Sequence, residues 1–141
     1  MMTYVWVMVG SALGGALRYA LTKATMQVSA GFPYGTVLIN VLGSFLIGYF
    51  GTLTLETGKY PVPENIRIFV MVGICGGFTT FSSFSLQTFD LMRSGAWMRA
   101  VANAVFSVIL CVSAVAAGHA LAHRQVAQEA IVQTAEEEYT G

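Results

Sequence analysis

The stretch GGFTTFSSFS, from Gly76 to Ser85, lies inside one of the most apolar regions of this chain. Its two glycines and two β-branched threonines disfavour a continuous helix. Its five hydroxyl residues and regularly spaced phenylalanines are unusual in such a region. A helix that breaks inside a membrane frees backbone carbonyls, and this is tolerated only where protein or a water-filled cavity covers them. The stretch therefore predicts a membrane helix that is broken at mid-membrane.

The composition of the whole chain is that of an integral membrane protein. Of its 141 residues, 55% are hydrophobic and only 10% are charged, whereas a soluble domain has about 25% charged residues. The net charge of zero provides no electrostatic footprint for nucleic acid. We therefore expect an all-α membrane protein without a nucleic-acid partner.

Four apolar segments, at about 4–26, 34–55, 66–92 and 96–121, are each near the ~20 residues that cross a bilayer core. Two prolines separate the middle pair, and RSGAW at 93–97 predicts a tight last turn. We expect residues 1–123 to form one transmembrane domain. Residues 124–141, with an acidic run at 136–138, are expected to form a polar, mobile tail.

Small residues spaced i,i+4 predict where helix backbones approach one another closely. These pairs are Gly10 with Gly14, Ser11 with Gly15, and Ser44 with Gly48.

The basic residues leave the orientation undecided. Three fall on one side of the predicted bundle and four on the other, whereas the positive-inside rule requires a bias. Either other signals orient the chain, or it inserts both ways, which permits an antiparallel homodimer. A near-balance also arises by chance. The two groups are Lys59, Arg67 and Arg124 against Arg18, Lys23, Arg93 and Arg99.

Several polar residues inside the apolar segments require a partner. Arg18 either faces a cavity or extends to the interface, and the sequence favours neither. Asn40 needs water or another helix as its partner. Asn103, Ser107 and Cys111 lie on one helical face, which is compatible with a wet path or with a polar seam between helices.

Other candidate sites are weaker. His119 and His123 have the i,i+4 spacing of metal ligands, but without a third ligand an interfacial pair free of metal is favoured. Cys75 and Cys111 lie in apolar runs without a CxxC motif and are interpreted as small buried thiols. No nucleophile, base and orienting group can be assembled, so we do not expect an enzyme.

The second half of the opening stretch has two interpretations. Phe81 and Phe84 share a helical face, and the positive edge of an aromatic ring solvates a small anion. Hydroxyls of Ser83 or Ser85 would add hydrogen bonds, while freed carbonyls would hold a cation. Alternatively, the rings pack against neighbours and the hydroxyls bond back one turn. From the residues alone, the second interpretation is slightly favoured.

Three motifs together resemble the Fluc family of fluoride ion channels. They are GGALRY at 14–19, GTVLINVLGSFLIG at 35–48 and GICGGFTTFSSFS at 73–85. The last is similar to the family's hallmark GGxTTFSTFS, with Ser83 in place of the usual threonine. The resemblance extends from about Val9 to Gly118.

This resemblance implies a passive channel in the bacterial inner membrane that exports fluoride from the cytoplasm. It implies an antiparallel, dual-topology homodimer with two pores and one structural sodium ion at its centre. The sodium would be held by backbone carbonyls of Gly76 and Thr79. In the fourth segment the family often has Tyr, Ser and Gly where this chain has Asn103, Ser107 and Cys111. The implied fluoride path comprises Phe81, Phe84, Asn40, Ser83, Ser85, Ser107 and Asn103, with Arg18 near a vestibule.

One residue departs from the family pattern, and two other functions stay open. Many members have a glutamate where this chain has Gln87, so any role of that carboxylate is in doubt here. A small dual-topology multidrug transporter would rely on a carboxylate embedded in the membrane, and the first segment has none. A non-transporting assembly subunit would use Asn40 and the small residues for packing only.

Overall fold

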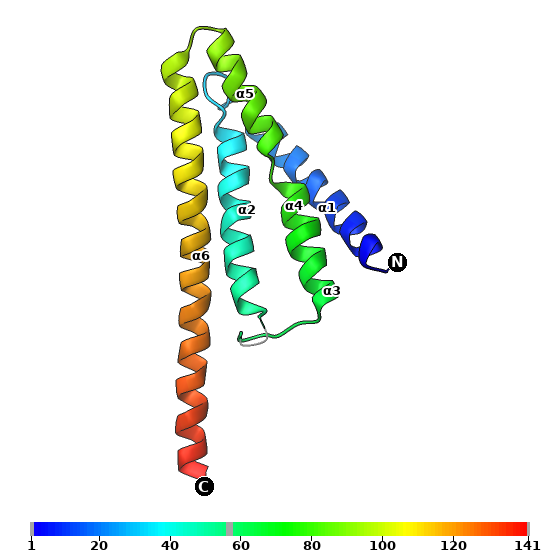
Figure 1. Cartoon of the computed structure of the whole chain (residues 1–141), viewed down its shortest axis with the longest axis vertical. Coiled ribbons are helices and arrows are strands. Elements are labelled where there is room, and N and C mark those ends of the chain that lie inside the picture. The colour runs from blue at the N-terminus through cyan, green and yellow to red at the C-terminus, as the bar shows by residue number, and fades with distance from the viewer. Residues whose placement is uncertain (1, 56–57, 141) are drawn as a thin grey trace.

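The computed structural model describes residues 2–55 and 58–140, and over these residues it contains helices and no strands (Figure 1). Met1, Glu56, Thr57 and Gly141 lie outside the described residues. Four helical stretches are long and apolar enough to cross a membrane: Met2–Ala24, Tyr34–Leu53, Glu64–Arg93 and Trp97–Gln128. For the described residues, the prediction of an all-α protein with four helical stretches apolar enough to cross a membrane is confirmed.

Two spans are single helices, and a third is assembled from shorter pieces. The first two spans are α1, Met2–Ala24, and α2, Tyr34–Leu53. The third span consists of α3 (Glu64–Arg67), a π-helical stretch η1 (Ile68–Cys75), α4 (Gly76–Phe78) and α5 (Phe81–Arg93). The last element is α6, Trp97–Thr140. The third span is therefore the irregular one. Gly76 and Gly77, which were expected to interrupt the helix, lie within α4, and the extended residues are Thr79 and Thr80.

The last helix is longer than the sequence analysis predicted. The fourth segment was expected to end near Leu121, but α6 continues to Thr140 and has 44 residues (Figure 1). Residues 124–140 are rich in Ala, Gln and Glu, which are strong helix formers, and contain neither Gly nor Pro. The polarity of these residues ends the span but does not end the helix.

Close backbone contacts hold the helices in two pairs. α1 packs along η1 and α4, while α2 packs along α6. A Cβ atom added to Gly10 would lie 2.6 Å from the Phe69 carbonyl oxygen, and one added to Gly48 would collide with the Val115 carbonyl oxygen. These contacts confirm close approach at Gly10 and Gly48. A Cβ on Gly15 would meet nothing within 4 Å, so Gly15 does not take part in such a contact.

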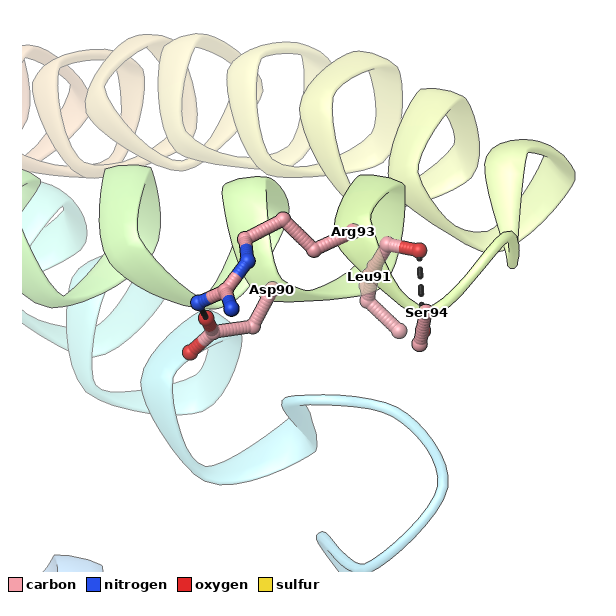
Figure 2. Close-up of polar contacts among 4 residues, drawn as sticks. All are labelled: Asp90, Leu91, Arg93 and Ser94. Carbon is pink, nitrogen blue, oxygen red and sulfur yellow. Dashed lines mark hydrogen bonds and ion pairs between the residues drawn. The ribbon is translucent and has the colours of Figure 1, made fainter.

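The turn between α5 and α6 is tight, as predicted. Gly95 has φ 77°, a left-handed conformation that glycine adopts without a Cβ penalty. The N–H of Ala96 donates to the Leu91 carbonyl at 2.9 Å, which is the long hydrogen bond of a Schellman motif. The Ser94 hydroxyl donates to the same carbonyl, also at 2.9 Å (Figure 2). This arrangement satisfies the last carbonyls of α5 and reverses the chain into α6.

The C-terminal end of α2 is capped by an arginine from α3. Arg67 Nη1 donates to the Gly51 carbonyl at 3.1 Å and to the Thr54 hydroxyl at 2.8 Å. A cation at a helix C-terminus also stabilises the helix dipole. Arg67 therefore ties the start of the third span to the end of the second.

Candidate functional site

The hallmark motif contains two extended residues between helices. α4 ends at Phe78, Thr79 has φ −78° and ψ 159°, and Thr80 has φ −152° and ψ 113°. The N–H of Thr79 still donates to the Cys75 carbonyl at 2.9 Å. The N–H of Thr80 donates instead to Asn40 Oδ1 at 2.8 Å. The Gly76 carbonyl therefore does not receive from Thr80 the bond that a continuous helix would provide.

Asn40 on α2 pairs with both backbone groups of Thr80. Its Oδ1 accepts from the Thr80 N–H, and its Nδ2 donates to the Thr80 carbonyl at 3.0 Å. Thr80 is only 7% exposed, so these groups have little access to other partners. The partner that the structure shows for Asn40 is therefore the extended backbone between α4 and α5, within the third span. A single side-chain amide thus replaces the helical hydrogen bonds that the extended residues lose.

The Thr80 side chain starts the next helix, a role that the sequence analysis missed. Its hydroxyl oxygen accepts from the Ser83 N–H at 3.1 Å, which caps the N-terminus of α5. The same hydroxyl donates to Ser83 Oγ at 3.1 Å. The available signal was a threonine three residues before Ser83, immediately ahead of the helical pattern.

A cavity of about 330 Å³ lies beside these residues. Its walls come from α2, from η1 with α4, from α5 and from α6. Apolar surface with a small number of polar groups is typical of a ligand site. The cavity brings together six of the predicted residues: Asn40, Gly76, Thr79, Phe81, Phe84 and Ser107. It also contacts Ser44, Cys75, Thr80 and Cys111.

The two phenylalanines of α5 lie against each other at the cavity. Their ring centroids are 5.3 Å apart and their planes are inclined by 43°. Phe81 is 78% exposed in the single chain. The pair therefore lines the cavity and also leaves a large apolar surface that lipid or a second protein surface must cover.

A chain of polar groups links the cavity to the α5–α6 contact. Ser107 Oγ donates to Asn103 Oδ1 at 3.4 Å, and Asn103 Nδ2 donates to the Thr88 hydroxyl at 2.8 Å. Thr88 in turn donates to the Phe84 carbonyl at 2.7 Å. The predicted stripe on the fourth span thus has two parts. Asn103, which is 1% exposed, forms a seam between helices, while Ser107 and Cys111 line the cavity.

The remaining predicted residues lie outside the cavity lining. Arg18 Nη1 donates to the Thr79 carbonyl at 3.5 Å, so this side chain points to the extended residues. Ser83 bonds to Thr80. Ser85 is exposed and donates to the Phe81 carbonyl at 2.9 Å. Ser85 therefore shows the backward bond of the alternative interpretation.

Gln87 lies in a different cavity, of about 270 Å³, beside the loop at residues 29–33. Asp90 and Ser94 also line this cavity. The Gln87 Oε1 atom is buried and has no hydrogen-bond partner among the described residues. Gln87 is thus separate from the cavity that holds Phe81 and Phe84.

Fold and site together define a small helical membrane protein with four candidate spans, whose third span borders an open cavity with aromatic and amide walls. A family profile described as "CrcB-like protein, Camphor Resistance (CrcB)" matches residues 5–119. The chain belongs to this CrcB-like family.

Close relatives carry a functional name. A protein of Gluconobacter oxydans is 58% identical over 138 residues, which cover 96% of both chains. One of Methylobacterium radiotolerans is 59% identical over 120 residues, 85% of this chain and 84% of the relative. One of Methylocella silvestris is 57% identical over 122 residues, 86% of this chain and 93% of the relative. All three are named fluoride-specific ion channel FluC.

Proposed function

We propose that this chain is a passive, fluoride-selective channel of the bacterial inner membrane that exports fluoride from the cytoplasm. One observation carries the proposal: Phe81, Phe84, Asn40 and Ser107 meet in one cavity of a chain whose relatives are named fluoride-specific ion channels. Channels are not enzymes, which agrees with the expectation that the chain has no catalytic site.

The chemistry of the cavity suits a small anion that must leave water. Asn40 Nδ2 has two hydrogens and gives one to Thr80, so the second can donate to an anion. The positive ring edges of Phe81 and Phe84 add favourable electrostatics without a full opposite charge. The N-terminus of α5 begins at the same point, and its dipole also favours negative charge. Several weak interactions solvate the ion without trapping it.

We further propose that the extended residues break the third span near the middle of the membrane and that a sodium ion binds there. Neutral carbonyl oxygens of unwound backbone are suitable sodium ligands. The Gly76 carbonyl receives no hydrogen bond from Thr80, and the Thr79 carbonyl has only a 3.5 Å contact with Arg18. These two carbonyl oxygens are therefore available as ligands, and the proposed ion would compensate their dipoles. One chain supplies two such oxygens, and a second chain would supply two more.

The proposed assembly is an antiparallel homodimer with dual topology and two pores. The three-to-four balance of basic residues and the exposed Phe81 ring support it. A cysteine in a C-terminal tag should then be labelled in part by a membrane-impermeant reagent added to intact cells, and the remaining molecules should be labelled only after the membrane is permeabilised. Labelling from a single side would exclude dual topology without affecting the proposed ion selectivity.

Fluoride efflux tests the function directly. The purified protein is placed in liposomes loaded with fluoride, and a fluoride electrode follows release, with chloride-loaded liposomes as the control. Rapid fluoride loss without chloride loss is expected. Fluoride loss that requires a proton gradient, or no loss at all, would contradict a passive channel.

Matched variants test the aromatic mechanism. Phe81→Ile and Phe84→Ile should each slow the flux, because both rings line the cavity. Phe106→Ile is the control, since Phe106 on α6 is 55% exposed and lies outside the lining. Equal fluoride flux in all three variants would contradict the proposal that the ring edges of Phe81 and Phe84 solvate fluoride.

A further inference from the structure

Two histidines lie one turn apart on α6, away from the cavity of the proposed ion path. The ring centroids of His119 and His123 are 6.1 Å apart, and both side chains are exposed. Thr52, next to the C-terminal end of α2, has its hydroxyl 2.8 Å from His119 Nδ1. The pair therefore lies where the second span ends.

The bonding of Thr52 determines which nitrogen of His119 carries the proton. The Thr52 hydroxyl donates its one hydrogen to the Gly48 carbonyl at 2.8 Å. At His119 it can therefore only accept, so Nδ1 of neutral His119 is the protonated nitrogen. The lone pair of His119 then lies on Nε2, and the hydrogen bond restrains the orientation of the ring.

We propose that His119 and His123 form a two-imidazole site for a divalent transition-metal ion such as Ni²⁺, Cu²⁺ or Zn²⁺. Two histidines at i,i+4 on one helical face are an established ligand pair. A metal-binding histidine almost always donates its other ring N–H to an oxygen, and Thr52 provides that oxygen. This orienting contact is invisible in the sequence, where the lack of a third ligand favoured a metal-free pair.

The rings have to approach slightly to share one ion. Two nitrogens about 2.1 Å from a tetrahedral ion are about 3.4 Å apart, which places the ring centroids about 5 Å apart. The observed centroid distance is 6.1 Å, so the rings have to come closer by about 1 Å. A small rotation of His123 suffices, while Thr52 holds His119. Among the described residues no group of three or more His, Cys, Asp and Glu side chains is placed to hold a metal. Water would complete the coordination, and the site would prefer metals that bind imidazole to Mg²⁺ or Ca²⁺.

Calorimetric titration of the full chain with Ni²⁺ tests the site, with the protein purified without a polyhistidine tag. One ion per chain is expected for the native protein, and Mg²⁺ should not bind. His119→Ala or His123→Ala should weaken Ni²⁺ binding at least 10-fold. Thr52→Val should weaken it by about 10-fold or more through loss of the orienting bond.

A rearranged pair distinguishes the proposed geometry from the mere presence of two histidines. The double variant Leu121→His with His123→Ala has histidines at i,i+2, which point to different faces of α6. It should bind Ni²⁺ as weakly as His123→Ala, with unchanged fluoride efflux as a check on folding. Native-like affinity in this variant, or no binding by the native chain, would overturn the site and would leave the proposed channel function untouched.

Discussion

Asn40 provides the sharpest test of how the hallmark motif is held. Replacement by leucine retains the approximate volume but removes both hydrogen bonds to the Thr80 backbone, at 2.8 and 3.0 Å. The Thr80 N–H would then lack a helical partner as well, because Thr79 and Thr80 are extended. The variant therefore leaves two backbone groups without their partner.

The expected loss of stability lies between two limits. An orphaned buried group costs about 1–3 kcal/mol, whereas an interhelical hydrogen bond in a membrane protein is worth about 0.6 kcal/mol on average. Two bonds therefore give a range of about 1–6 kcal/mol. The 330 Å³ cavity beside Thr80 allows partial hydration, which favours the lower part of that range. We expect about 2 kcal/mol, roughly a 30-fold change in the folding equilibrium.

Reversible unfolding in mixed detergent measures this difference, and fluoride efflux is measured in parallel. Asn65→Leu is the matched control because Asn65 is exposed on α3 and its removal affects no such contact. Asn40→Leu should be the less stable variant and should conduct fluoride more slowly. A free energy of unfolding within about 0.5 kcal/mol of the Asn65→Leu value would refute the reasoning.

Three further changes follow from the geometry. Gly14→Ala should lower the free energy of unfolding by about 1–3 kcal/mol, because the new Cβ would collide with the Ile74 carbonyl oxygen. Gly15→Ala is the control: its Cβ would enter open space, so the variant should be neutral or stabilising by up to about 1 kcal/mol. Equal effects of the two substitutions would disprove the packing argument. Thr80→Val removes the cap of α5 and should destabilise the protein by about 1 kcal/mol in the same unfolding assay. Thr22→Val is the control, because it removes only a bond to the preceding turn. A loss of stability in Thr80→Val no larger than that in Thr22→Val would exclude a capping role. Gln87→Met should leave stability equal or higher, because it removes a buried oxygen that has no partner among the described residues, whereas Gln87→Glu should be less stable and slower in fluoride efflux; a more stable or more active Gln87→Glu would contradict this.

Much of the fold could be predicted from local sequence. The length and hydropathy of a segment predict a span because lipid accepts only backbone that bonds to itself. The hallmark motif indicated the irregular region only roughly, because Gly76 and Gly77 remain helical and the extended residues are Thr79 and Thr80. The prediction placed the end of α6 too early, because it treated the polarity of residues 124–140 as the end of the helix. Polarity indicates that a segment is exposed to water, but it does not lower helix propensity, and these residues remain helical.

Long-range pairing is what the tertiary structure decided. Asn40 needed a partner by sequence alone, but only the packing of α2 against the third span shows that it bonds to Thr80. The two serines were indistinguishable in the sequence, yet Ser83 bonds to the Thr80 cap and Ser85 bonds back to Phe81. Likewise, the contact of Thr52 with His119 joins residues 67 positions apart. Hydropathy and propensity are properties of neighbouring residues, so they predict helices and their ends. The partner of a side chain depends on which helices meet, and at what level, and no local pattern contains that information.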